Sequence, residues 1–442
     1  MTTPVWDFVR RYAGADAARL HMPGHKGVPL LGCEPLDITE VQGAGELYGD
    51  SALLTESRQN AAALFGSGAT LYSTEGSSLC VRAMAYLALT LRPNGTPPVI
   101  LAARNVHRSF VSALALCGGE AVWLWPETRR SLCACEIPPA ALEKALDALP
   151  APPAAVYVTS PDYLGGLADI PGLSAVCHAR GVPLLADNAH GAALRFLDPC
   201  LHPLALGADL CCDSAHKTLP VLTGGAYLHL SARLPAAFFS AAEGAMALFA
   251  STSPSWLTLA SLDRCNALLA DTWPRELRRT AKALEKLRQR LARAGWTLRR
   301  GGDPLRLTLA GDGAVIAARL REGGVEPEYA DRDFCVLMAS PGNPQSHLDR
   351  VADALGENDL PPRRPVPLCM NPPERVCSVR EAVFAPRETV PLEKALGRVC
   401  AGIPAACPPA VPVCVPGERL DRDALALLRA LGHRSVEVLT ER

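Results

Sequence analysis

The chain has 442 residues, of which 49% are hydrophobic, and its 44 basic and 45 acidic residues leave a formal net charge of -1. A chain of this length and composition can bury a large core in two or three domains, which excludes a disordered protein. The near-neutral charge provides no field that would attract nucleic acid or an anionic membrane, so a small molecule is the expected partner.

Short apolar segments alternate with helix-length segments through the first half of the chain. A helix is expected to begin at Asp50 or Ser51 and to end near Leu64, and another covers residues 77–91, where a Pro-Asn-Gly turn stops it. The expected strands cover residues 69–73, 99–103, 121–125, 154–159, 182–186, 208–212 and 225–230. This alternation is typical of an α/β fold, in which helices cover both faces of a mainly parallel sheet.

The sequence pattern changes after about residue 245. Residues 276–294 predict a long, charged amphipathic helix that opens a second, smaller α+β domain. The prolines of residues 361–367 predict an extended linker, because proline cannot donate a backbone hydrogen bond. A C-terminal module with helices at residues 390–400 and 422–431 follows. The predicted domains are therefore residues 1–245, 246–360 and 361–442.

The sixteen cysteines indicate neither a disulfide framework nor a metal site. They are scattered through apolar segments such as Cys211-Cys212, where buried thiols fit. Cys133 and Cys135 have one residue between them, fewer than a zinc knuckle requires, so no metal is expected. The N-terminus has no basic region followed by an apolar run, and no apolar segment approaches the ~20 residues of a membrane span. We expect a cytoplasmic protein with no membrane partner.

The segment Asp213-Ser-Ala-His-Lys-Thr-Leu-Pro220 carries the strongest functional signal. Lys217 lies just past a short apolar strand, where it could form a Schiff base with pyridoxal phosphate, with Ser214 and His216 facing the phosphate. Asp187 ends an earlier apolar strand and could pair with the pyridine nitrogen, since a buried carboxylate is costly unless it is paired. A nearby arginine or a helix N-terminus could pair with Asp187 instead, and Lys217 could be a surface lysine.

Two further candidates follow neighbouring strands of the expected sheet. Gly76, Ser77 and Ser78 open a helix, so backbone N–H groups, two hydroxyls and the helix dipole could cradle a phosphate. The same turn could be an ordinary helix N-cap. His107 follows the next strand and could stack on a flat heteroaromatic ring, or simply cap its helix. Because open parallel sheets bind ligands at the carboxyl ends of their strands, we expect these residues to converge.

These residues resemble the Orn/Lys/Arg decarboxylases, pyridoxal phosphate enzymes of fold type I (aspartate aminotransferase-like), and especially the short arginine/lysine decarboxylase branch that lacks an N-terminal wing domain. The resemblance runs over nearly the whole chain. The matching motifs are His21-Met-Pro-Gly-His-Lys-Gly27, Asp37-Ile-Thr-Glu40, Gly76-Ser77-Ser78, Asn105-Val-His107, Asp187-Asn-Ala-His-Gly191, Ser214-Ala-His-Lys-Thr-Leu-Pro220 and Val415-Pro-Gly-Glu418.

The resemblance implies that Lys217 binds the cofactor covalently, that Asp187 pairs with the pyridine nitrogen and that His107 stacks on the ring. It implies phosphate contacts from Gly76, Ser77, Ser78, Ser214 and His216, and a site shaped beside the ring by His190. The implied reaction is decarboxylation of arginine, lysine or ornithine in polyamine metabolism, with His216 or Lys217 returning a proton. The implied assembly is a homodimer or a larger homo-oligomer, with active sites across the interface.

The sequence departs from the family pattern at three places. Asn188 replaces a glutamate, Cys400-Ala401-Gly402 stands where relatives read Ser-Ala-Glu, and Cys407-Pro-Pro-Ala-Val-Pro412 stands where they read Tyr-Pro-Pro-Gly-Ile-Pro. These changes concern the choice of amino acid more than the cofactor chemistry. The head group of a basic substrate could meet an acid from among Glu40, Glu46, Asp50 and Glu418, each of which could equally be a solvated or capping acid.

Two other classes of function share these residues. An aminotransferase or a carbon–sulfur lyase on the same fold would keep Lys217 and Asp187, but it should carry an arginine that clamps the substrate α-carboxylate, and no distinctive motif supplies one. A non-catalytic protein of the same fold, with or without bound pyridoxal phosphate, is the third interpretation.

Overall fold

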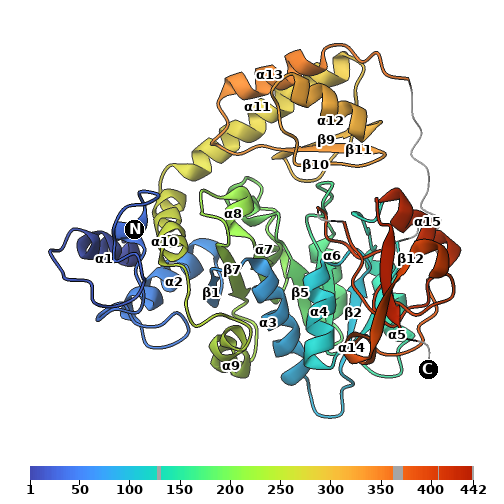
Figure 1. The fold of residues 1–442 in the computed structure, drawn as a ribbon, viewed down its shortest axis with the longest axis horizontal. Coiled ribbons are helices and arrows are strands. Elements are labelled where there is room, and N and C mark those ends of the chain that lie inside the picture. The colour runs from blue at the N-terminus through green and yellow to red at the C-terminus, as the bar shows by residue number, and fades with distance from the viewer. Residues whose placement is uncertain (127–130, 362–371, 407, 441–442) are drawn as a thin grey trace. The chain divides into compact units, whose positions relative to one another are not determined.

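The computed structural model covers residues 1–442 and describes all of them except residues 127–130, 362–371, 407 and 441–442. The chain divides into two compact units, one of residues 1–91 and 183–279 and the other of residues 92–182 and 280–442. Figure 1 labels the helices and strands of both. Apart from residue 361, the linker predicted at residues 361–367 lies outside the described residues, as does Cys407. The predicted domain boundaries stay a prediction.

The first unit is built around four strands. In spatial order they are β1 (Ala69–Ser73), β7 (Ala226–Leu230), β6 (Leu210–Asp213) and β5 (Leu184–Asp187). Strands β5 and β6 run parallel, whereas β7 is antiparallel to both β6 and β1. Asp187 lies opposite Cys212 in the register of β5 and β6. The carboxyl ends of these two strands therefore lie at the same edge of the sheet.

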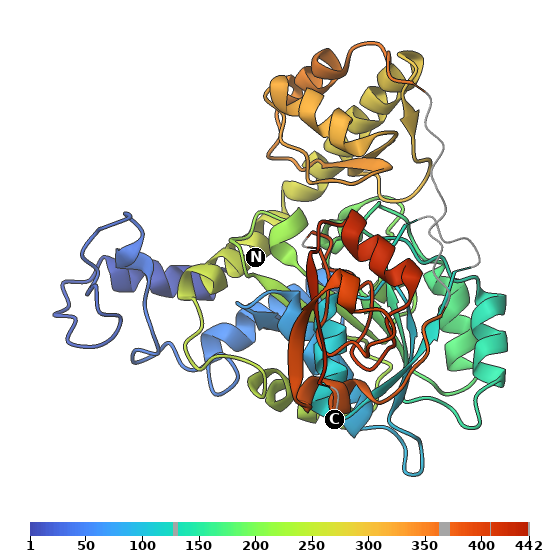
Figure 2. The ribbon, with the colours of Figure 1, turned by 45° about the vertical axis from the view of Figure 1, so that its right-hand side comes forward.

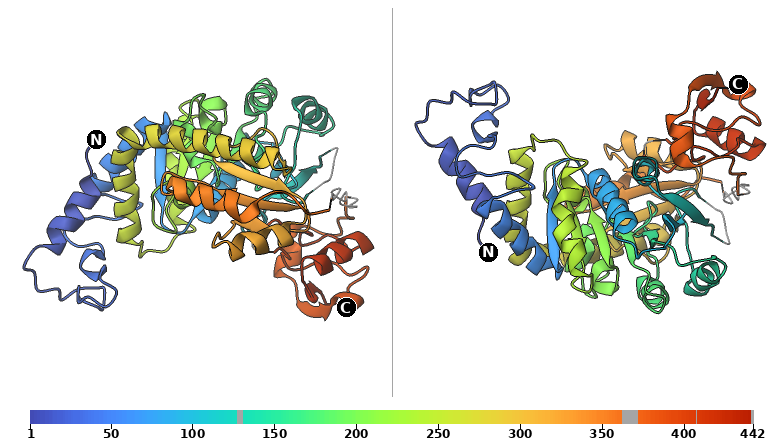
Figure 3. Two further views of the ribbon diagram at one scale, coloured as in Figure 1. Left: turned by 90° about the horizontal axis from the view of Figure 1, so that it is seen from above. Right: turned by 90° about the horizontal axis from the view of Figure 1, so that it is seen from below.

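Helices accompany these strands in the first unit. They are α1 (Pro4–Ala13), α2 (Ala52–Phe65), α3 (Ser77–Thr90), α7 (Pro203–Leu206), α8 (Ala215–Thr218), α9 (Ala236–Ala247) and α10 (Trp256–Ala270). Helix α3 contacts β6 and β7, and α1 lies along α10 in both views of Figure 3. The hydroxyl of Ser51 accepts a hydrogen bond from the Leu54 N–H, which confirms the predicted start of α2.

The second unit begins with three parallel strands. Strand β2 (Val99–Ala103) pairs with β3 (Glu120–Leu124) on one side and with β4 (Ala155–Thr159) on the other. Helices α4 (Arg108–Cys117) and α5 (Pro139–Asp147) connect them along the chain, and α6 (Ile170–His178) follows β4. Parallel strands alternating with helices in both units confirm the predicted α/β class, and the predicted strands match within about two residues at each end.

A four-stranded sheet follows in the second unit, in the order β10 (Tyr329–Ala330), β11 (Phe334–Met338), β9 (Arg306–Ala310) and β8 (Thr297–Leu298). One face of this sheet is covered by helices α11 (Trp273–Arg293), α12 (Gly313–Glu322) and α13 (Gln345–Leu355), as Figure 1 shows. The long charged helix predicted at residues 276–294 is α11, whose Leu284 and Leu291 join the core beneath the helices. Within the described ranges, no helix is both long and apolar enough to cross a membrane.

The last part of the second unit contains α14 (Val379–Phe384), β12 (Arg387–Pro391), α15 (Arg422–Ala430) and β13 (Ser435–Leu439), drawn in red in Figure 2. The predicted helix at residues 390–400 is wrong. Val390 lies in β12 and pairs with Val436 of β13, and only the short 3-10 turn Leu392–Lys394 follows. A strand partner 46 positions along the chain overrides the local helical preference, because strand formation depends on tertiary pairing.

Candidate active site

Lys217 stands in a short helical turn directly after β6. The strand ends at Asp213, Ser214 follows, and α8 carries Lys217. The Nζ of Lys217 lies 2.9 Å from Nε2 of His190, which is buried and follows β5. An ammonium group can only donate hydrogen bonds, so this nitrogen of His190 accepts one. The lysine amine therefore reaches from the end of β6 to the loop that follows β5.

Asp187 ends β5 and confirms the prediction of a buried carboxylate at this point, because the residue is only 2% exposed. Its Oδ1 accepts a hydrogen bond from the Ala189 N–H at 3.1 Å and one from the Cys212 thiol at 3.5 Å. Both donors fix the direction of the carboxylate. Since β5 and β6 are parallel neighbours, Asp187 and Lys217 stand at the same edge of the sheet.

The predicted phosphate cradle has the groups that an anion needs. Gly76 has a φ of 73°, and an added Cβ would meet only the Ser78 nitrogen, 4.0 Å away. Helix α3 begins at Ser77 with no side-chain cap on its first N–H groups. The hydroxyl of Ser214 donates to the hydroxyl of Ser77 at 2.7 Å, which joins the start of α3 to the end of β6. The residues therefore fit a phosphate beside Lys217.

His216 is half-buried and holds α8 to the turn before β7. Its backbone N–H donates to the Gly225 carbonyl at 3.1 Å, and Nδ1 lies 3.0 Å from the same oxygen. Burial lowers the pKa of His216, and the charge of Lys217 lowers it further, against the raising effect of the Gly225 carbonyl. Nδ1 carries the proton that the carbonyl accepts, so Nε2 is the nitrogen left for other contacts.

His107 belongs to the other unit of the chain. It caps α4, since its Nδ1 accepts a hydrogen bond from the Ser109 N–H at 3.2 Å and lies 2.8 Å from the Ser109 hydroxyl. The capping interpretation is therefore confirmed. Its stacking on a cofactor ring stays a prediction.

Glu418, one of the four candidate acids for a basic substrate, is only 4% exposed and already engaged within the second unit. Its Oε2 lies 3.4 Å from Arg104 Nη2 and accepts the Val415 N–H at 2.7 Å. Burial raises the pKa of Glu418, although Arg104 opposes the shift. The other three candidates, Glu40, Glu46 and Asp50, are all exposed.

Arg104, which the sequence analysis missed, is the partner that holds Glu418. Its guanidinium also donates to the Pro412 and Val413 carbonyls at 3.0 Å each, and it lies 5.1 and 5.3 Å from the ring centroids of Trp123 and Trp125. The sequence feature that could have identified Arg104 is its position directly after the apolar strand β2.

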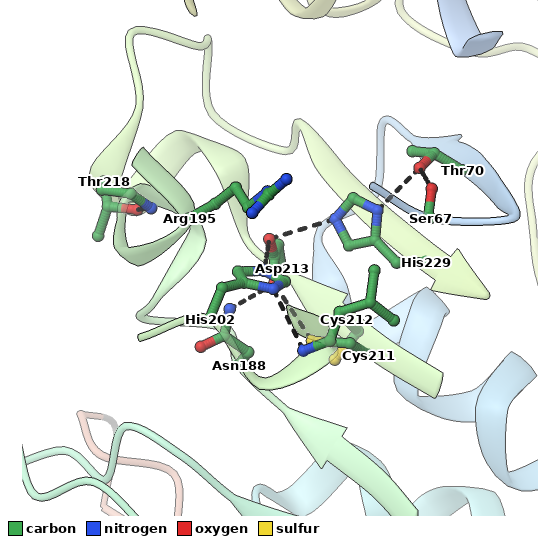
Figure 4. A network of polar contacts seen from close by, with 12 residues as sticks. Ser67, Thr70, Asn188, Arg195, His202, Cys211, Cys212, Asp213, Thr218 and His229 are labelled. Carbon is green, nitrogen blue, oxygen red and sulfur yellow. Dashed lines mark hydrogen bonds and ion pairs between the residues drawn. The ribbon is translucent and has the colours of Figure 1, made fainter. Parts of the chain in front are cut away.

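The sequence analysis also missed a buried polar network at the end of β6, which Figure 4 shows in close-up. At its centre lies Asp213, the residue before Ser214, which contacts both His202 and His229. The sequence feature that could have revealed this network is the presence of a carboxylate and two histidines in otherwise apolar segments. Such buried polar groups need hydrogen-bond partners, so they are expected to contact one another.

Comparison with known proteins supports the same interpretation. The family model "Orn/Lys/Arg decarboxylase, major domain" matches residues 3–303, and the corresponding C-terminal domain model matches residues 369–436. An arginine decarboxylase of Bacillus subtilis (strain 168) is 26% identical over 471 aligned positions, which cover 96% of this chain and 93% of that protein. An arginine decarboxylase of Halalkalibacterium halodurans is 28% identical over 465 positions, covering 97% and 93%.

A solved structure has the same fold. The constitutive lysine decarboxylase of E. coli superposes with a TM-score of 0.80 at 17% identity, covering 99% of this chain and 82% of the other. This likeness confirms the fold type I architecture. The major-domain model covers more than half of the chain and includes the lysine, the carboxylate and the cradle described above. The chain therefore belongs to the Orn/Lys/Arg decarboxylase family, whose members are pyridoxal phosphate-dependent amino acid decarboxylases.

Proposed function

We propose that this protein removes the α-carboxyl group of a basic amino acid, arginine, lysine or ornithine, and releases the corresponding amine for polyamine metabolism. The observation that carries the proposal is the position of the Lys217 amine, which lies beside His190 at the sheet edge where Asp187 ends the adjacent strand. Relatives named arginine decarboxylase, each matched over more than 90% of its length, support a long basic substrate.

The predicted site residues would divide the contacts with the cofactor among them. Lys217 would bind it covalently, and Asp187 would face the pyridine nitrogen. Gly76, Ser77, Ser78, Ser214 and His216 would hold the phosphate, His190 would shape the site beside the ring, and His107 would stack on it. When bound, pyridoxal phosphate supplies the electron sink that accepts the electron pair left as carbon dioxide departs.

Each protein group has a limited task in this reaction. The Asp187 carboxylate, oriented by Ala189 and Cys212, would keep a proton on the pyridine nitrogen, and this electrostatic stabilisation would be the main contribution of the protein to the rate. Lys217 would hold the cofactor between turnovers, and its amine would be free to act on the substrate while the amino acid is bound. His216 or Lys217 delivers the proton to Cα that replaces the lost carboxyl group.

The head group of the substrate would meet one or more acids from the set Glu40, Glu46 and Asp50. Glu418 is a weaker candidate, because Arg104 and the Val415 N–H already occupy its carboxylate. Arginine, lysine and ornithine differ in head-group geometry, since a guanidinium binds a carboxylate through two parallel hydrogen bonds and an ammonium binds as a point charge. We also propose a homodimer or larger homo-oligomer located in the cytoplasm.

The test is a panel of arginine, lysine and ornithine incubated with the purified protein and pyridoxal phosphate. We expect one of the three to release carbon dioxide in equal amount to the amine formed. Keto acid formation without carbon dioxide would instead support an aminotransferase. A protein that binds no cofactor, shown by the absence of a yellow colour that borohydride bleaches, would overturn the proposal. Lys217→Ala, assayed alongside, controls for release that does not depend on the site.

A further inference from the structure

We propose that Asn188 and Asp213 form a buried positioning pair that fixes the two strand ends carrying Asp187 and Lys217. The inference rests on the proposed cofactor site, because its consequence is the placement of those two residues. Asn188 directly follows Asp187, and Asp213 lies one residue before Ser214. Both side chains are fully buried. Two hydrogen bonds run between the strand ends, from the Asn188 N–H to the Cys212 carbonyl at 3.0 Å and from Asn188 Nδ2 to Asp213 Oδ1 at 2.7 Å.

Asp213 receives hydrogen bonds on both of its carboxylate oxygens. His202 Nε2 lies 2.9 Å and His229 Nε2 3.2 Å from Oδ2, while Asn188 and the Cys211 thiol, at 3.6 Å, donate to Oδ1 (Figure 4). Burial alone would raise the pKa of Asp213, but the contacts with His202 and His229 outweigh it and lower the pKa well below its usual range. Asp213 is therefore an anion that accepts hydrogen bonds from four donors. These donors supply the partners that a buried carboxylate needs, so no cation is required to pair with it.

The two histidines have their remaining nitrogens engaged as well. His202 Nδ1 accepts the Leu204 N–H at 3.3 Å, so Nε2 carries the proton that Asp213 accepts. His229 Nδ1 lies 2.8 Å from the Thr70 hydroxyl. The ligand atoms of His202, Cys211 and Asp213 lie within 4.8 Å of one another, a spacing that a metal ion would also give. Because hydrogen bonds account for each of these atoms, we assign the cluster to the scaffold of the site.

The pair explains why this chain departs from the family pattern at position 188. A glutamate there would place a second carboxylate against Asp213, and two carboxylates in one buried site cannot both remain ionised. An amide donates to the carboxylate instead, so Asn188 and Asp213 are matched residues. The departure at position 188 thus belongs to the strand-to-strand scaffold and not to the contacts with the amino acid substrate.

The experiment compares Asn188→Asp, Asp213→Asn and the double variant that exchanges the two groups. In the exchanged pair, the amide placed at position 213 can turn its oxygen to both histidines and its nitrogen to the carboxylate placed at position 188. The histidine and amide donors then have acceptors again, and only the weak Cys211 thiol loses one. We expect Asn188→Asp to weaken pyridoxal phosphate binding by about tenfold or more, since a buried unsatisfied group costs about that factor. Asp213→Asn should bind within about fivefold of wild type, because an amide keeps the bonds to both histidines. The double variant should recover most of what Asn188→Asp loses.

Asp209 provides the matched control. It is buried, and its Oδ2 accepts the Leu184 N–H at 2.9 Å, so it links the same two strands at their opposite ends. Asp209→Asn should lower the denaturant midpoint of the cofactor-free protein while leaving the visible absorption of the lysine-bound cofactor unchanged. Asn188→Asp should change both quantities. This contrast separates positioning of the site from general stability of the sheet.

The measurements are cofactor titration by absorbance, denaturant unfolding of each protein without cofactor, and metal content by mass spectrometry. The inference is overturned if the double variant binds no better than Asn188→Asp, if Asp209→Asn alters cofactor binding equally, or if the wild-type protein carries one metal ion per chain. If Asn188→Asp does not fold, recovery of folding and binding in the double variant supports the pair, and its failure overturns it. A wild-type protein that binds no cofactor would count against the proposed function instead.

Discussion

The Nζ of Lys217 lies 2.9 Å from Nε2 of His190, although the two residues are 27 positions apart. The contact exists because β5 and β6 are parallel neighbours whose carboxyl ends meet at one edge of the sheet. Asp187, three residues before His190, stands at that edge too. A lysine and a carboxylate on adjacent strand ends are the two groups that the proposed reaction requires.

Replacing Lys217 by alanine should abolish steady turnover and the yellow colour that borohydride bleaches, because the covalent bond to the cofactor requires an amine at this position. The measurements are carbon dioxide release and absorbance after reconstitution with pyridoxal phosphate. Lys286→Ala, an exposed lysine on α11, is the control and should retain both. Undiminished turnover in Lys217→Ala would rule out its covalent role.

Asp187→Ala should retain part of the cofactor but lower kcat by roughly a hundredfold, which is the usual cost of removing one preorganised electrostatic partner. Binding survives in part because the phosphate cradle at Gly76, Ser77 and Ser214 is unaffected. The measurements are kcat at saturating cofactor and the cofactor dissociation constant. A kcat within a factor of about two of wild type would contradict the assignment.

The stability of the first unit should fall as the pH drops below about 6.5. Burial lowers the pKa of His229, although the contacts with Asp213 oppose the shift, so below that pH the unfolded chain binds a proton that the folded chain does not. Stability therefore rises with pH through this range and is lost on acidification. His229→Gln keeps a donor for Asp213 but does not titrate, so its denaturant midpoint should change less between about pH 7.5 and about pH 5.

The control for this pH series is His347→Gln, because His347 is exposed on α13. Its pH dependence should match that of wild type. Equal slopes for wild type and His229→Gln would show that His229 does not titrate differently in the folded protein.

Ala410→Gly should stabilise the protein by about 1 kcal/mol. Ala410 has a φ of 58°, a left-handed conformation that strains any residue with a Cβ and that glycine adopts freely. The measurement is urea unfolding of both proteins. Ala401→Gly, a buried alanine that does not have a positive φ, is the control and should destabilise. A lower midpoint for Ala410→Gly than for wild type would contradict the strain argument.

The sequence predicted those features that depend on local signals. The strands at residues 69–73 and 99–103 are apolar runs between turn residues, and the motif around Lys217 is contiguous, so both could be read before the sheet was known. The contacts of Asp213 could not be predicted, because Asn188, His202 and His229 meet it only after β5, β6 and β7 are placed side by side. The contact between Arg104 and Glu418 could not be predicted either, because the two residues are 314 positions apart in the chain.

The contacts of Arg104 with the C-terminal segment have an evolutionary consequence. Apart from Glu418, the guanidinium holds this segment through the main-chain oxygens of Pro412 and Val413, not through their side chains. Every residue type offers a carbonyl oxygen, so substitutions at positions 412 and 413 need not loosen the attachment. The side chains at these two positions are therefore free to diverge while Arg104 keeps its hold on the segment.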